Sequence, residues 1–288
     1  MSLPSSYAPS PTPSPAATPS RPPYPTAPLL VRYGLLNALA DFRATYSWRS
    51  WLFGWLGRML AQVVFFTGLG RALGDPATVR YLALGNALMT CVIDTMAVVA
   101  STSGERRAGT LSLLIAGPAD PVWVFVGRSL HWPASGVVTS LVALFGLGPL
   151  FGVTWRPAQV PGVVALVALT ALATYCVGLF LAMIVLSVPR LRNVVSNCAY
   201  LAMMAFCGVQ VPLGYWPAPV RWAAQAVPLT HTLRALRLVN EGSGWTAPLW
   251  PATLALLTGL IWLLAAFGTF RWLVAVPARR AGTLDLSV

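Results

Sequence analysis

The sequence contains no lysine and few charged residues of any kind. All nineteen basic residues are arginine, and they stand against only seven acidic residues in a chain of 288. Because a phosphate-binding P-loop needs a lysine beside its glycine-rich turn, the chain has no nucleotide-hydrolysing site of that class. The charged fraction of 9% is far below the roughly 25% of soluble domains. These shortages exclude an ordinary soluble domain.

Residues that bind metals or form disulfides are equally scarce. The four cysteines all lie in apolar runs and form no C-x-x-C pair: Cys91, Cys176, Cys198 and Cys207. We interpret them as packing residues. The two histidines, His131 and His231, are far apart in sequence. The acidic residues do not cluster either, so we predict no metal site, no cofactor and no catalytic centre on this chain.

Long apolar runs are what the sequence does contain. Six runs of about 18 to 26 residues occupy positions 51–69, 81–100, 132–151, 163–188, 194–211 and 249–274, and the mean hydropathy is +0.69. At 1.5 Å per residue, each run can cross a hydrocarbon core of about 30 Å. We therefore predict an all-α integral membrane protein with six transmembrane helices, formed by residues 29–288.

The N-terminal region differs in composition from the rest. Residues 1–28 hold ten of the 25 prolines, and we predict a disordered cytoplasmic tail that is not a signal peptide. Between positions 29 and 49, Leu35, Leu36 and Leu39 share one helical face. This pattern predicts an interfacial helix at the membrane surface, ahead of the first span.

The distribution of arginine predicts the orientation. With a cytoplasmic N-terminus, eleven arginines fall on the inner side and six on the outer side, which favours cytoplasmic N- and C-termini in a bacterial cell (inner) membrane. The net charge of +12 is scattered over loops. We therefore expect anionic membrane lipids, and not nucleic acid, as the counter-charge.

A charged stretch separates the second and third runs. Thr102 and Glu105 have the spacing of a capping box, and Leu111 continues a helical face that Gly117 and Pro118 end. We predict a helix of about three turns that begins at Thr102 and lies on the cytoplasmic surface. From these residues alone, a connecting helix held by lipid headgroups is as good an interpretation as a docking site for another protein.

The sequence "GERRAGTLSLLIAGPADPVWVFVGRSL" resembles the E-R-x-x-G-T-L-x-x-L-x-x-x-P region of type-2 ATP-binding-cassette (ABC) exporter permeases. The matching residues are Glu105, Arg106, Gly109, Thr110, Leu111, Leu114 and Pro118. In that family the region is a coupling helix that docks into the ATPase subunit. The resemblance implies that role here for Thr102, Ser103, Gly104, Glu105, Arg106, Arg107, Gly109, Thr110 and Leu111. The chain departs from the common pattern at Arg107 and Ser112, where an acidic residue is frequent.

The outer segment before the last run carries a second resemblance. Proline positions predict two short helices within residues 212–248, dipping into the outer leaflet as re-entrant helices. His231, Arg234 and Arg237 recur every three residues, and we favour a stripe facing lipid headgroups over one contacting substrate. The family's P-L-T-x-x-x-x-x-L-R element matches Pro228, Leu229, Thr230, Leu236 and Arg237.

Two charged residues lie inside predicted spans. Arg58 is roughly 10 Å and Asp94 roughly 9 Å from the cytoplasmic end of its run. Because a lone charge is costly in lipid, we hypothesise an ion pair between Arg58 and Asp94, as a structural lock in preference to a substrate site.

The resemblance implies an exporter permease without its own ATPase. Its partners would be separate ABC ATPase subunits that carry ATP and Mg, and a second permease in a homodimer or heterodimer. The apolar, aromatic-rich spans suggest an amphiphilic or hydrophobic cargo such as a drug, natural product or modified peptide. A lipid-linked glycan is the alternative cargo, and a secondary transporter or channel without an ATPase is the alternative class.

Overall fold

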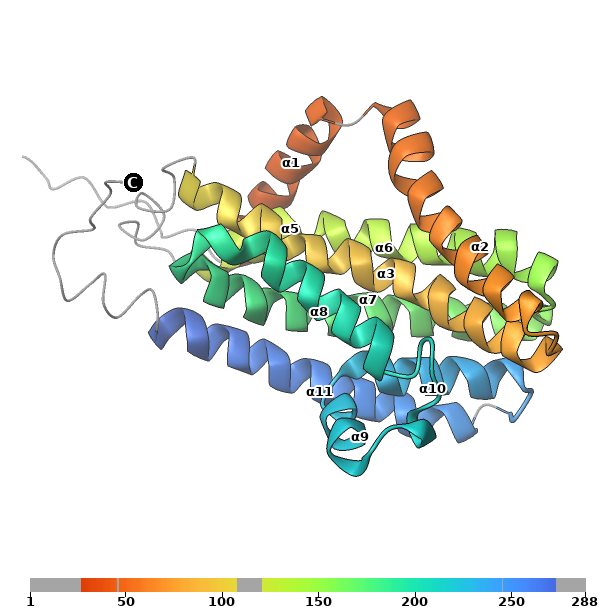
Figure 1. Cartoon of the computed structure of the whole chain (residues 1–288). Coiled ribbons are helices and arrows are strands. Elements are labelled where there is room, and N and C mark those ends of the chain that lie inside the picture. Colours follow the sequence, from red (N-terminus) through yellow and green to blue (C-terminus); the bar gives the residue numbers. More distant parts are fainter. Residues whose placement is uncertain (1–26, 46, 108–120, 245, 273–288) are drawn as a thin grey trace, which may run out of the picture.

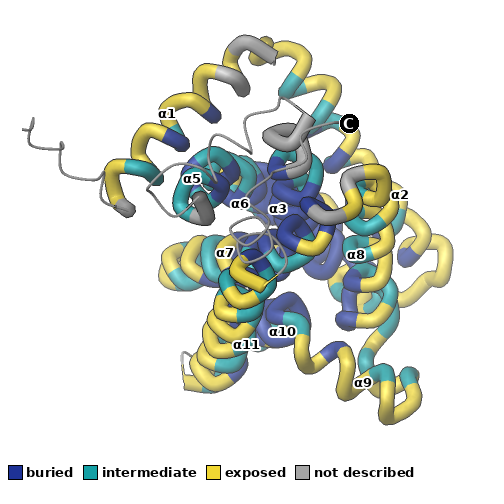
Figure 2. Tube along the Cα trace, turned by 90° about the vertical axis from the view of Figure 1, so that its left-hand side faces the viewer, coloured by how far each residue is buried: buried dark blue, intermediate teal, exposed yellow. Residues whose placement is uncertain are grey.

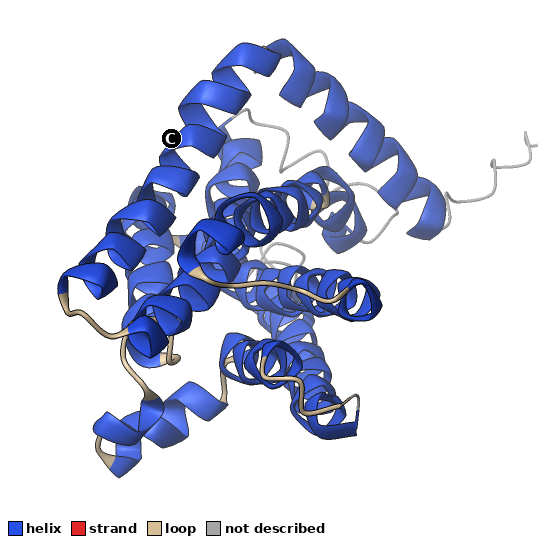
Figure 3. Cartoon of the chain, turned by 90° about the vertical axis from the view of Figure 1, so that its right-hand side faces the viewer, coloured by secondary structure: helices blue, strands red, loops and turns tan. Residues whose placement is uncertain are grey.

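The computed structural model describes residues 27–45, 47–107, 121–244 and 246–272 (Figure 1). These residues form helices joined by short connections, and no strand occurs among them (Figure 3). The predicted proline-rich tail falls almost wholly outside the described residues. The all-α prediction is therefore confirmed for the described part of the chain.

Most of the predicted spans are present. The helices are α1 Ala27–Thr45, α2 Gly57–Ala72, α3 Pro76–Arg107, α5 Pro121–Ser129, α6 His131–Val142, α7 Val160–Ser187, α8 Arg192–Phe206, α9 Ala218–Gln225, α10 Pro228–Asn240 and α11 Thr246–Phe270. Two π-helical turns, η1 (Ser50–Leu56) and η2 (Ala143–Leu147), extend α2 and α6. In the described part of the chain, five helical stretches are long and apolar enough to cross a membrane: Ser50–Ala72, Pro76–Thr102, Trp123–Phe151, Pro157–Leu186 and Thr246–Phe270.

Helix α3 is the centre of the bundle. It contacts α2, α6, α7, α8 and α10, and nearly all of its residues between positions 81 and 102 are buried (Figure 2). Its polar side chains, among them Asn86, Thr90 and Asp94, would be costly against lipid, which explains this central position. By contrast, α2 and α11 keep large apolar side chains outside, such as Phe65 (68% exposed) and Leu264 (63% exposed). These faces suit contact with lipid.

The bundle has two ends, visible in Figure 1. The end of α3, the starts of α5 and α8 and the end of α11 lie together, and we name this the 107 end. The turn between α2 and α3, the connection before α7 and the turn between α10 and α11 lie at the opposite end, the 152 end. The long helices therefore alternate in direction, as successive membrane spans do.

The predicted span 194–211 is not a single helix. Helix α8 has 15 residues, which is about 22 Å of helix, and it starts at the 107 end and stops partway along the bundle (Figure 1). Residues 207–211 are non-helical, and Gly208 has a φ of 81°, a conformation that favours glycine and ends the helix. Helices α9 and α10 follow, so two short helices are present within 212–248 as predicted. Their predicted place in the outer leaflet, as re-entrant helices, stays a prediction.

The helix predicted between positions 29 and 49 is present as α1. Its buried residues, Gly34 and Ala38, are small, and this lets α1 approach α5 closely: a Cβ on Gly127 of α5 would lie only 2.6 Å from the Val31 carbonyl oxygen. The helices α1 and α5 therefore cross at close backbone distance. Leu36 (52% exposed) and Leu39 (38% exposed) point away from the protein, as an apolar face directed at a membrane surface would.

Candidate functional site

The stretch that resembles a coupling region begins inside a longer helix. Helix α3 continues through Thr102 to Arg107, so the prediction that a new helix starts at Thr102 is wrong. The Thr102 hydroxyl is buried and has no hydrogen-bond partner in the described part of the chain, so it does not cap a first turn. The hydroxyl of Ser101 donates to the Val98 carbonyl oxygen at 3.0 Å, a bond within the helix.

The remaining residues of the predicted coupling set are only partly described. Residues 103–107 have helical backbone, and nothing further is described for their side chains. Gly109, Thr110 and Leu111 lie outside the described residues, as does the rest of the cytoplasmic helix that was predicted to begin at Thr102. The coupling role of these residues therefore stays a prediction. Residues 102–107 form the end of α3.

A buried carboxylate joins three helices near the middle of α3. Asp94 is fully buried and accepts hydrogen bonds from Trp55 Nε1 at 2.7 Å, Ser135 Oγ at 3.0 Å and Thr139 Oγ1 at 3.1 Å. Trp55 belongs to η1, whereas Ser135 and Thr139 belong to α6. The carboxylate therefore ties the first span to the second and third. We name these four residues the Asp94 cluster.

The predicted ion pair between Arg58 and Asp94 is not formed. The Arg58 guanidinium lies 5.0 Å from the centre of the Trp55 ring, and Trp55 stands between the two charges. Asp94 is stabilised by neutral donors instead, because the tryptophan and the two hydroxyls already occupy its oxygens. The sequence reasoning missed these donors because it searched the spans for charged partners and did not count an indole N–H.

A second polar cluster lies toward the 152 end. The Gly208 carbonyl oxygen accepts from Tyr81 Oη at 2.6 Å and from Arg237 Nη2 at 2.8 Å. The Arg237 guanidinium also lies 3.6 Å from the centre of the Tyr81 ring. These contacts fasten the non-helical residues 207–211 to α3 on one side and to α10 on the other. We name the three residues the Gly208 clamp.

The same segment has further contacts with α3. The amides of Asn86 and Gln210 bond to each other in both directions, at 3.3 Å and 2.9 Å. A Cβ on Gly85 would lie 2.6 Å from the Val209 carbonyl oxygen. Irregular backbone at membrane depth is tolerated where protein covers its polar groups, and α3 provides that cover here.

The predicted headgroup-facing stripe on α10 does not exist as one surface. His231 is buried, and its Nε2 lies 2.8 Å from the Gln225 carbonyl oxygen. Arg237 belongs to the Gly208 clamp, and only Arg234 is exposed. The physical reason is that α10 packs against both α7 and α11, which cover most of its circumference. Pro228 begins the helix, and Thr230 donates to the Ala224 carbonyl oxygen at 2.6 Å.

The arrangement is that of a membrane bundle in which one central helix connects a charged end to an irregular segment at the opposite end. The family model for the ABC-2 type transporter matches residues 35–239. The chain belongs to the ABC-2 type transporter family. No curated protein sequence matches the chain significantly.

Membership of this family identifies the chain as the transmembrane subunit of an ABC transporter. An ABC-2 permease domain typically has no ATPase of its own, and the family generally pairs with ABC ATPase subunits. The match covers α3, the Asp94 cluster, the 102–111 stretch and the Gly208 clamp. The sequence-based resemblance to type-2 ABC permeases is therefore confirmed.

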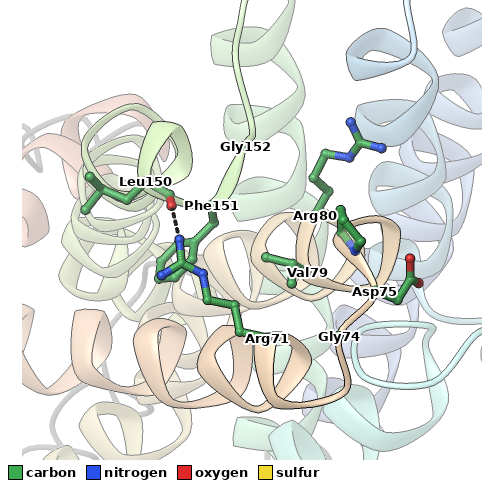
Figure 4. Close-up of a pocket in the computed structure, with 9 residues that line it drawn as sticks. Arg71, Gly74, Asp75, Val79, Arg80, Leu150, Phe151 and Gly152 are labelled. Atoms are coloured by element: carbon green, nitrogen blue, oxygen red, sulfur yellow. Dashed lines mark hydrogen bonds between the residues drawn. The ribbon is translucent and has the colours of Figure 1, made fainter.

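This ABC-2 transporter also has an open pocket at the 152 end, shown in Figure 4. Its volume is about 320 Å³, and it lies between the α2–α3 turn and the segment before α7. Arg71 donates to the Leu150 carbonyl oxygen at 2.8 Å. Asp75 accepts from the backbone N–H groups of Ala77 and Thr78 at 3.0 Å and 2.9 Å, and so caps α3. The Thr78 hydroxyl and these two amides lower the pKa of Asp75.

Proposed function

We propose that the chain is the transmembrane half of an ATP-driven exporter, and that residues 102–111 receive the movement of a separate ATPase subunit. The observation that carries the proposal is the continuity of α3 from Pro76 to Arg107. A continuous helix transmits displacement as a rigid element. The matched motif begins in the last turns of α3, at the 107 end, and the proposal is that a partner outside the bundle docks there.

The contacts of α3 describe how such a movement would spread. The Asp94 cluster connects α3 to the first and third spans, and the Gly208 clamp connects it to α10. Docking and closure of the ATPase would push on the 107 end. The push would then shift the spans around α3 and release the outer segment, which converts ATP hydrolysis into alternating access.

The proposal includes an assembly and an orientation. Two permeases, as a homodimer or a heterodimer, would form the pathway, with the 107 end and both termini in the cytoplasm of a bacterial cell. The segment from α8 to α10 would supply the sixth crossing in two pieces. The exposed apolar faces of α2 and α11 support a cargo taken from the membrane, namely an amphiphilic or hydrophobic compound.

The test combines substitutions with the assembled transporter. The double variant Glu105→Ala, Arg106→Ala, reconstituted with its ATPase, is expected to lose at least tenfold in transport and in substrate-stimulated ATP hydrolysis. Arg190→Ala, an exposed arginine at the same end, is the matched control and should behave like wild type. Transport that persists in liposomes without ATP or any ATPase would overturn the proposal. So would a double variant that remains fully coupled and bound to the ATPase.

A further inference from the structure

Arg58 is a charged residue on the outside of the first membrane-spanning helix. It is the ninth residue of the span Ser50–Ala72, so its Cα lies about 12 Å along the helix from the first residue. That position is well inside a hydrocarbon core of about 30 Å. The side chain is exposed on the surface of the chain. A charged group at such a position needs a counter-charge or a polar partner.

No carboxylate among the described residues supplies that counter-charge. Arg58 forms no ion pair and no hydrogen bond with any residue that the structure describes, and its guanidinium lies 5.0 Å from the centre of the Trp55 ring. Asp94 is the only carboxylate in the five spans. It is fully buried and already accepts three hydrogen bonds.

A second copy of the chain would not supply it either. A copy in the same membrane and orientation presents the same spans at the same depth, and its Asp94 is equally enclosed. The net charge of +12 leaves the chain with an excess of cations. No described carboxylate of this chain or of a second copy is therefore available to Arg58, and an anion from outside the chain would fill that role.

The surroundings of Arg58 indicate what kind of anion fits. Gly54 and Ala61 are exposed on the same helix face, and a Cβ on Gly54 would meet nothing within 4 Å. These small residues leave space beside the guanidinium. Phe53 and Phe65 are exposed nearby, with 75% and 68% of their side chains accessible. One positive charge bordered by open apolar surface matches a ligand with an anionic head and an apolar tail.

The face of the first span that carries Arg58 is exposed. Figure 1 shows α2 meeting α3 at the 152 end and diverging from it toward the first residues of the span. Trp55 reaches across to Asp94, with 2.7 Å between indole nitrogen and carboxylate oxygen. The bond fixes the ring, and the fixed ring in turn holds the guanidinium by a cation–π contact. Arg58 is therefore oriented before any ligand arrives.

We propose that Arg58, held over Trp55, binds the anionic headgroup of an amphiphile within the membrane, and that anionic amphiphiles are the cargo class of this exporter. The assignment of cargo rests on the proposed function. The same headgroup chemistry is also offered by anionic phospholipids, so the experiment must separate a cargo molecule from a resident lipid.

Binding is measured first, without ATP. The permease is placed in nanodiscs of phosphatidylcholine and titrated with dodecyl phosphate carrying a fluorescent NBD group, and in parallel with the uncharged NBD-dodecanol. Wild type is expected to bind the phosphate probe at least tenfold more tightly than the alcohol. Arg58→Gln should abolish this preference, and Arg58→Lys should retain part of it. Arg221→Gln, an exposed arginine on α9, is the matched control and should keep the full preference.

The site is overturned if wild type shows no preference for the phosphate probe, or if Arg58→Gln keeps the preference. Thermal stability is measured to detect a folding defect, and both Arg58→Gln and Arg58→Lys should have the thermal stability of wild type. Partial binding by Arg58→Lys then shows that the positive charge matters. If Arg58→Gln, Arg58→Lys and the control Arg221→Gln all lost the preference for the phosphate probe, that result would also count against a specific site.

The occupant is identified by two further measurements. Phosphatidylglycerol is added to the nanodiscs, and ATP-driven transport of the phosphate probe is measured in liposomes with the ATPase. A cargo site predicts poor displacement by the lipid and a loss of transport of at least tenfold in Arg58→Gln. Ready displacement by the lipid with unchanged transport in the variant identifies a lipid site and overturns the cargo assignment. Binding that depends on Arg58 without ATP-driven transport of the phosphate probe would overturn the cargo assignment and leave both the site and the proposed exporter function standing.

Discussion

At the scale of single residues, Asp94 shows how a membrane protein keeps an acid inside a span. Its carboxylate is fully buried, and three neutral donors surround it. Burying a charge is costly unless it is hydrogen-bonded, and charge-assisted bonds are the strong ones. The cluster therefore contributes to stability mainly by avoiding an unsatisfied acid, and it fixes the distance between α3, α6 and the first span.

The bond from Trp55 is open to direct measurement. Trp55→Phe removes the indole N–H and keeps an aromatic ring, so one of the three bonds to Asp94 is lost. We expect a loss of about 1.5–3 kcal/mol in the free energy of unfolding, the range for a hydrogen bond to a charged group. Denaturation in detergent micelles measures it. Trp250→Phe, at an exposed position on α11, is the control and should change stability little. Equal effects of the two substitutions would contradict the role assigned to the cluster.

The sequence predicted part of this residue-scale picture. A carboxylate in an apolar run demands a partner, and that expectation was correct for Asp94. Its partner could not be deduced, because Trp55, Ser135 and Thr139 belong to residue types that usually serve as ordinary packing or polar residues in a span. Which of them meet depends on the rotation of each helix about its own axis. The π-helical turn η1 changes that rotation at Trp55.

At the scale of elements, residues 207–211 are the most unusual part of the chain. This short segment interrupts a run that is apolar enough to be one helix, and it is held by the Gly208 clamp and by the paired amides of Asn86 and Gln210. Hydropathy alone could not predict the break, because a buried loop and a buried helix require similarly apolar residues. The glycine at 208 gives the local signal, but many membrane helices contain glycine without breaking.

The close packing of residues 207–211 against Gly85 can be tested by substitution. Gly85→Ala places a Cβ only 2.6 Å from the Val209 carbonyl oxygen, which is closer than van der Waals contact allows. We expect a loss of about 1–3 kcal/mol from overpacking, together with a local rearrangement at residues 207–211. Gly68→Ala is the control, because its Cβ would meet nothing within 4 Å. Hydrogen exchange of residues 207–211 should increase in Gly85→Ala alone. If exchange and stability stay unchanged in both variants, the contact does not constrain the segment.

Some helix boundaries were predicted well from the sequence, and others were not. Spans such as Ser50–Ala72 and Thr246–Phe270 agree with the apolar runs within a few residues, because membrane spans are selected by length and hydropathy. The boundary at Thr102 was wrong because a hydroxyl followed by an acid indicates a possible cap, while tertiary contacts decide whether the preceding helix ends. Helix α3 continues, and this continuity is what makes it suitable for transmitting movement.

At the scale of the whole molecule, the arrangement of ends constrains the number of crossings. Helix α7 ends at the 107 end and α11 begins at the 152 end (Figure 1). The chain between them must traverse the bundle. Helix α8 covers about 22 Å and α10 about 20 Å, which together exceed a core of about 30 Å. We therefore propose an even number of crossings, with a sixth crossing divided between α8 and α10.

Thiol labelling tests this topology in intact cells. Asn193 and Ser243 are both exposed and lie on opposite sides of the divided crossing. In a variant without the four native cysteines, Ser243→Cys should react with a membrane-impermeant maleimide from outside, and Asn193→Cys only after the membrane is opened. Thr154→Cys, at the 152 end, is the control and should react like Ser243→Cys. Because α8 alone is too short to span, labelling of positions 193 and 243 from the same side would show that the segment turns back within the membrane. The chain would then have five crossings, and its termini would lie on opposite sides.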